Sequence, residues 1–292
     1  SPIGNRMQSE RAFLTAKRNA YQHVTKHDWV GAAQDLGALS RDARFSAKDW
    51  LSLAIASIHA GSLVDAARAA RRALAEDPDN FRVVQVLTIA LMEQHRWSEV
   101  VEVFESHGHL EAAQESFSFL VNQGTALWQL RRLKESLDVF LRALSLNISD
   151  PSVHLRIGLV LKDLKMYDEA AESFLTTVAL QPDRLSARLM AIHMRQYACD
   201  WRDFDASCRE AGAAMARLNP EQPEHGEGAT FALLGIPHPP ALFKVAAQQA
   251  AAFHTGRVLP LPPQTRERDS AGRIRIGYLS CDFHNHATAQ LL

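Results

Sequence analysis

The feature that most constrains this 292-residue chain is an internal repeat with a period of 34 residues. Stepping back 34 residues from Gly158 reaches Gly124, and the same step from Phe174 reaches Phe140. The block 151–184 aligns with the preceding block of equal length without a gap. A unit this short cannot enclose a core alone, so successive units must stack and cover one another's apolar faces.

Five units share the pattern, and the third needs two extra residues to stay in register. They span residues 13–46, 47–80, 81–116, 117–150 and 151–184. Four of them have a small residue in both halves, as at Gly124 and Ser136, and the third has Thr88 and Val100 there. Three of the five have an aromatic such as Phe140 four residues after the second of these positions. On two helices these small residues permit close approach, and the aromatic fills the gap between them. A sixth, degenerate pair is predicted at 185–218.

These positions resemble the tetratricopeptide repeat (TPR), which has this period. The resemblance implies an all-α superhelical solenoid of helix pairs, with the first helix of each pair lining a concave face. The competing interpretation is an ordinary helical bundle, but a bundle would not hold one phase across five units.

We predict that polar or basic side chains of the first helices line a peptide-binding groove. By repeat position they are Lys17, Arg18, Tyr21, Lys48, Ser52, Arg82, Gln85, Asn122 and Arg156. None of them is a carboxylate, and such donors suit the backbone carbonyls of an extended peptide, or an acidic segment. The alternative is that each of them simply lies on a solvated helix face.

The composition argues against other kinds of partner. The net charge is -1, from 32 Lys+Arg and 33 Asp+Glu, which favours neither nucleic acid nor a membrane surface. The three cysteines lack metal-ligand spacing, and we expect a reducing, cytoplasmic location and no metal site. Histidines on the helices, His193 among them, are expected to lie on surfaces. Homodimerisation through the repeats is left open.

The composition changes after residue 218. Residues 219–272 read as a helical and proline-rich linker, with a helix beginning near Lys244. Residues 273–280 then read as a strand, followed by a polar loop and the start of a helix. Strand, loop and helix N-terminus in this order are typical of the first unit of nucleotide-binding α/β domains.

The repeats, the sequence CDW at 199–201 and the segment RIRIGYLSCDFHNHATAQLL at 273–292 together resemble the O-GlcNAc transferase and SPINDLY-like glycosyltransferases. The resemblance implies that 273–292 begins a Rossmann-like lobe. It also implies transfer of a sugar, GlcNAc from UDP-GlcNAc or fucose from GDP-fucose, to Ser or Thr of proteins. His286 matches the family's active-site histidine, a contact or general base, and Asp282, Asn285 and Thr288 would support its loop.

Two positions depart from the animal enzymes, which have a small residue in place of His284 and proline in place of Ala287. They favour the bacterial branch and leave the donor sugar open. Because the sequence ends at Leu292, we expect the lobe to be truncated and this chain alone to be inactive and to hold no cofactor. The alternative function is a non-enzymatic TPR adaptor that binds peptides or acidic segments.

Overall fold

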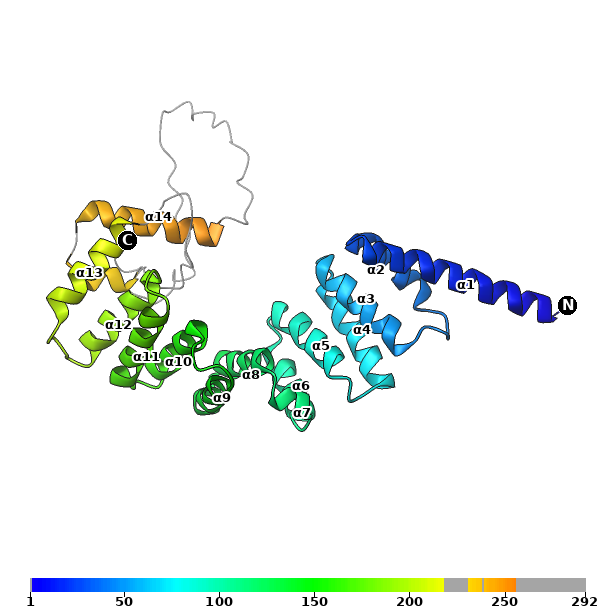
Figure 1. Ribbon diagram of the computed structural model, residues 1–292, viewed down its shortest axis with the longest axis horizontal. Coiled ribbons are helices and arrows are strands. Elements are labelled where there is room, and N and C mark those ends of the chain that lie inside the picture. Colours follow the sequence, from blue (N-terminus) through cyan, green and yellow to red (C-terminus); the bar gives the residue numbers. More distant parts are fainter. Residues whose placement is uncertain (1, 218–230, 238, 256–292) are drawn as a thin grey trace, which may run out of the picture. The chain divides into compact units, whose positions relative to one another are not determined.

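The computed structural model describes residues 2–217, 231–237 and 239–255 (Figure 1). Within these ranges the chain consists of helices and the turns between them, without a strand. The chain divides into two compact units, Ser1–Phe253 and His254–Leu292, and the first of them holds the repeats. No helix in the described ranges is long and apolar enough to cross a bilayer.

Six consecutive helix pairs make up the repeats, and Figure 1 shows them in chain order. They are α1 (Pro2–Thr25) with α2 (Trp29–Leu39), α3 (Ala47–His59) with α4 (Leu63–Glu76), α5 (Phe81–Glu93) with α6 (Trp97–His107), α8 (Phe117–Gln129) with α9 (Leu133–Leu146), α10 (Pro151–Asp163) with α11 (Tyr167–Leu180), and α12 (Leu185–Tyr197) with α13 (Phe204–Ala216). In the first five pairs the second helix also packs against the first helix of the next pair. The all-α stacked arrangement predicted from the 34-residue period is therefore confirmed.

In several helices the residue directly before the helix caps it with its side chain. Asp28, Asn80, Ser116 and Asp150 each accept a hydrogen bond from the backbone N–H three residues further on. Of these, Asp28 caps a second helix and the other three cap first helices. Each such cap stabilises its helix by about 1 kcal/mol because it satisfies a backbone donor that the helix leaves unpaired.

The turn inside every pair closes in the same way. The second residue after the first helix adopts a left-handed φ of 56–78°: His27, Gly61, His95, Arg131, Lys165 and Cys199. The N–H of the following residue donates to the carbonyl five residues back, as from Met166 to Leu161 at 2.9 Å. The left-handed residue itself donates to the carbonyl three residues back, as from Lys165 to Lys162 at 3.0 Å. These two hydrogen bonds together are the Schellman motif. Five of the six residues are not glycine, so each of those turns carries a strain of roughly 1–2 kcal/mol.

Close approach of two helices depends on the small residues predicted from the repeat. A Cβ atom added to Gly124 would lie 2.7 Å from the ring of Phe140, and one on Gly158 would lie 2.7 Å from Phe174. Both rings are fully buried. Ser136, also buried, donates from Oγ to the carbonyl of Gly124 at 2.7 Å. The predicted role of these positions is confirmed.

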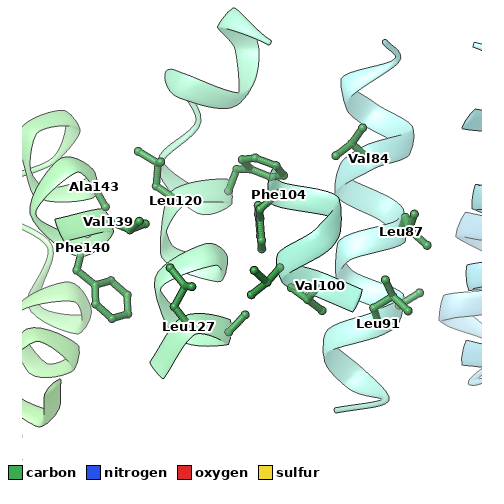
Figure 2. Close-up of a cluster of buried hydrophobic side chains, with 14 of the residues drawn as sticks. Val84, Leu87, Leu91, Val100, Phe104, Leu120, Leu127, Val139, Phe140 and Ala143 are labelled. Atoms are coloured by element: carbon green, nitrogen blue, oxygen red, sulfur yellow. The ribbon is translucent and has the colours of Figure 1, made fainter. Parts of the chain in front are cut away.

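The apolar core runs continuously from one pair to the next. Figure 2 shows Val100 and Phe104 of α6 lying between α5 and α8. The ring of Phe104 meets that of Phe119 edge-on, with centroids 4.4 Å apart. The two extra residues of the third unit are accommodated by a short helix, α7 (Glu111–Gln114), before α8 begins.

The degenerate sixth pair keeps its core by exchanging large and small residues. Ile192 stands where the fifth pair has Gly158, and Cys208 stands where it has Phe174. Both are buried in a cluster that includes Leu233 of the short 3-10 helix η1 (Phe231–Gly235). The sixth pair therefore still buries apolar side chains at these two positions although the sequence pattern is lost.

The linker and the segment after it are described only in part. The helix expected from Lys244 is α14, which begins earlier, at Pro240, and ends at Thr255. Proline is favourable in the first turn because its missing N–H would be unpaired there anyway. The predicted strand at 273–280 lies outside the described residues. So do the predicted site residues Asp282, Asn285, His286 and Thr288.

We expect Gly124→Ala to lower the free energy of unfolding by up to about 2 kcal/mol. Alanine favours the helix by about 1 kcal/mol, but its Cβ would strike a ring that cannot move away, and such overpacking costs roughly 1–3 kcal/mol. Urea denaturation followed by circular dichroism measures the change. Gly37→Ala on α2 is the matched control, since no atom lies within 4 Å of its added Cβ. That variant should be neutral or more stable, and equal behaviour of the two would contradict the packing argument.

Candidate binding surface on the first helices

The surface made by α1, α3, α5, α8, α10 and α12 is called here the first-helix face, and it carries all nine predicted groove residues. Lys17, Arg18 and Tyr21 lie on α1, Lys48 and Ser52 on α3, Arg82 and Gln85 on α5, Asn122 on α8, and Arg156 on α10. The structure separates them into two groups. Three side chains are committed to an internal network, whereas the other six form no hydrogen bond or ion pair with any residue in the described ranges.

The internal network centres on Asp49, a fully buried carboxylate at the third residue of α3. Its Oδ2 lies 2.7 Å from Lys17 Nζ and accepts from the backbone N–H of Ser46 at 3.0 Å and the Ser46 hydroxyl at 2.7 Å. Its Oδ1 accepts from the Tyr21 hydroxyl at 2.8 Å, and that hydroxyl lies 3.1 Å from Ser52 Oγ. Lys17, Tyr21 and Ser52 therefore join α1 to α3.

The network shifts the pKa of two of its members. Burial alone would raise the pKa of Asp49, but the hydrogen bonds from Lys17, Ser46 and Tyr21 outweigh it and hold that pKa below its usual value. Burial, with a further contribution from the adjacent Asp49, raises the pKa of Tyr21 to about 12. Asp49 is thus an anion and Tyr21 a neutral donor at neutral pH. The sequence analysis missed Asp49, although Ser46 and Asp49 have the spacing of a helix capping box.

Three of the six uncommitted residues come together at one hollow between α3, α5 and α8. The hollow has a volume of about 300 Å³ and is lined by Ile55, Arg82, Gln85, Val86, Thr88, Ile89, Ser118, Phe119 and Asn122. Arg82 is exposed, and Gln85 and Asn122 are half-buried. Arg18, Lys48 and Arg156 do not line it.

The hollow combines an apolar floor with a polar rim. Val86 and Phe119 are buried, and Ile89 is 42% exposed at its edge. Thr88 is also buried, and its hydroxyl is already used because it donates to the carbonyl of Val84 at 2.8 Å. The side-chain polar groups open to a ligand are therefore mainly the guanidinium of Arg82 and the two amides.

A second hollow of about 340 Å³ lies between α10, α11, α12 and η1, and it contains no predicted site residue. It is lined by Lys162, Tyr167, Met190, His193, Met194, Tyr197 and Ala232. The rings of Tyr167 and Tyr197 are stacked with centroids 5.0 Å apart, and His193 meets Tyr197 edge-on. Burial lowers the pKa of His193. His193, expected on the surface, is only partly exposed, because its ring packs against Tyr197.

We expect Asp49→Asn to lower the free energy of unfolding by about 2 kcal/mol at pH 7, since it leaves Lys17 without its buried partner. The pKa of Asp49 is lowered in the folded state, so its contribution is complete above the unfolded-state value of about 3.9 and is lost as the pH falls through the folded-state value. Urea denaturation at pH 7 and pH 3 should show the difference from the parent shrinking at the lower pH. The exposed Asp138→Asn on α9 is the control, and an equal loss there would contradict this role.

The comparisons with known proteins agree with this architecture. The family model for the tetratricopeptide repeat matches residues 151–184, the pair α10–α11. A structure of MamA is similar over 59% of this chain and 97% of its own, with 23% identity and a TM-score of 0.53. A structure of YrrB, described as a TPR protein with an unusual peptide-binding site, covers 70% of this chain and 98% of its own, with 21% identity and a TM-score of 0.56. The chain therefore has the fold of a tetratricopeptide repeat protein, and its fifth unit matches that repeat in sequence.

Proposed function

We propose that this chain binds extended segments of partner proteins on its first-helix face, at the hollow between α3, α5 and α8. The observation that carries the proposal is the meeting of Arg82, Gln85 and Asn122 at that hollow, with no hydrogen-bond partner in the described part of the chain. These three residues lie on α5 and α8. The repeat brings them together, because it places successive first helices side by side.

The chemistry of the hollow suits a peptide. An extended peptide offers a donor and an acceptor at each residue, and the amides of Gln85 and Asn122 can both donate and accept. A volume of about 300 Å³ lies at the small end of ligand pockets. It has room for a side chain on the floor of Val86 and Phe119, while the peptide backbone crosses the rim. The peptide-binding site described for YrrB, which has the same fold, supports this use of the fold.

We also propose that the array is the acceptor-binding part of a protein O-glycosyltransferase. This rests on the sequence resemblance at 199–201 and 273–292. In that role the first-helix face would hold the protein acceptor, and UDP-GlcNAc would be the sugar donor. His286 would contact the donor or the acceptor hydroxyl, in a loop that Asp282, Asn285 and Thr288 support. A peptide-binding adaptor without enzymatic activity is the alternative.

We expect the combined change of Arg82, Gln85 and Asn122 to alanine to weaken peptide binding at least about tenfold, because each lost hydrogen bond costs on the order of 1 kcal/mol. The ligand is a peptide selected from a displayed random dodecapeptide library and titrated by fluorescence anisotropy. Helical circular dichroism should be unchanged because none of the three side chains contributes to the core. Arg142→Ala, on the exposed surface of α9, is the control and should bind like the parent. Unaltered binding by the triple variant would place recognition elsewhere.

The glycosyltransferase proposal is tested in the protein encoded by the whole gene. With radiolabelled UDP-GlcNAc and cell protein as acceptor, we expect label on Ser or Thr. His286→Ala should lower the rate about a hundredfold, within the range for loss of a general acid or base. If neither UDP-GlcNAc nor GDP-fucose labels protein, the adaptor function is favoured. Label that is unaffected by His286→Ala would remove this residue from the active site.

A further inference from the structure

We propose that the hollow between α3, α5 and α8 selects peptides that carry an acidic residue beside an apolar one, and that Arg82 binds the carboxylate of the acidic residue. The inference rests on the proposed peptide binding and adds the class of ligand. Two observations support it: the charge on Arg82 has no partner in the described ranges, and the floor of the hollow is apolar.

The lining of the hollow holds one charged side chain, and that side chain has no counter-ion among the residues that the structure describes. Arg82 is the lining residue that bears a charge, and it forms no ion pair within the described ranges. The acids nearest to it in sequence, Asp77 and Asp79, form no ion pair with it in the described ranges. Asp77 accepts a hydrogen bond from Asn80 at 2.9 Å, and Asp79, whose side chain is 78% exposed, lies 3.9 Å from His109. Glu93 is at the opposite end of α5, about 16 Å along the helix axis.

The neighbouring first helix adds positive charge and no free negative charge. Lys48 is the second residue of α3, as Arg82 is of α5, and it is exposed and without an ion pair in the described part of the chain. The adjacent Asp49 is fully buried and accepts hydrogen bonds from Lys17, Ser46 and Tyr21. It cannot serve Lys48 as a partner. Lys48 and Arg82 are therefore two exposed cations at the start of neighbouring first helices, each without an ion pair in the described ranges, although the whole chain carries a net charge of -1.

The floor of the hollow defines the neighbour of the acidic residue. Ile89 lies on the same helix as Arg82, about two turns further on, and with Val86 and Phe119 it forms an apolar surface. An extended peptide advances about 3.3 Å per residue. A carboxylate at Arg82 thus places a side chain one or two residues away over the apolar surface. The planar guanidinium can donate two hydrogen bonds to one carboxylate, which favours Asp or Glu over a neutral amide.

The test uses the whole chain and peptides selected on it from a displayed random dodecapeptide library. We expect the selected peptides to share an Asp or Glu next to an apolar residue. Replacing that Glu by Gln in the peptide should weaken binding about fivefold at low salt, and added salt should reduce this difference. In Arg82→Ala the Glu and Gln peptides should bind equally. In Arg82→Glu, a peptide with Lys in place of Glu should bind better than the Glu peptide. Arg142→Ala should retain the full discrimination.

The outcomes separate this inference from the proposed function. If the peptides bind and the double change Gln85→Ala with Asn122→Ala weakens them, but Glu and Gln peptides bind alike, the hollow binds peptides and the acidic selectivity is wrong. Discrimination that persists in Arg82→Ala would likewise overturn the role of Arg82. If the library yields no peptide that this double change weakens, the proposed function fails and the inference fails with it.

Discussion

The whole array depends on the apolar contact between each second helix and the first helices on either side of it. Within a pair, that contact requires a gap for an aromatic ring, which Gly124 gives to Phe140 and Gly158 gives to Phe174. Between pairs, the same second helix covers the next first helix, so that one core continues from Ala20 to Met194. A single pair has no equivalent core, and the stability of each unit therefore includes a large contribution from its neighbours.

This mutual burial also explains how the turns can be strained. Arg131 and Lys165 hold left-handed φ angles that cost roughly 1–2 kcal/mol each. A fully buried phenylalanine such as Phe174 contributes about 3 kcal/mol by the transfer of its ring from water. The turn is short because the second helix must return directly onto the first. Packing between the two helices is thus large enough to hold each turn closed without glycine.

The period alone was sufficient to predict the helix pairs and the roles of Gly124 and Phe140, because spacing in the sequence becomes spacing on a helix surface. Other features have no such signature. The sequence does not reveal the left-handed turns, because His95, Arg131 and Lys165 are not typical turn residues. The buried state of Asp49 depends on Lys17 and Tyr21, which lie on a helix 28–32 residues earlier in the chain. The hollow lined by Tyr167 and Tyr197 likewise requires two units in contact. A sequence pattern assigns residues to faces of helices, but it does not show which polar side chains on a face form hydrogen bonds with one another.

That distinction bears directly on function, because the same face uses its polar residues in two ways. Between α1 and α3 the donors of Lys17 and Tyr21 are consumed by a buried carboxylate, so they hold helices together and are poorly placed to bind anything else. Between α5 and α8 the polar groups of Arg82 and Asn122 remain open to water, where an unpaired donor carries little cost. Since the core is built by the apolar contacts of the second helices, these open positions can change without loss of the fold. In the proposed binding mode, the chemistry of the partner is determined by a few side chains on the rim of one hollow, with Arg82 as the group that selects for an acidic residue.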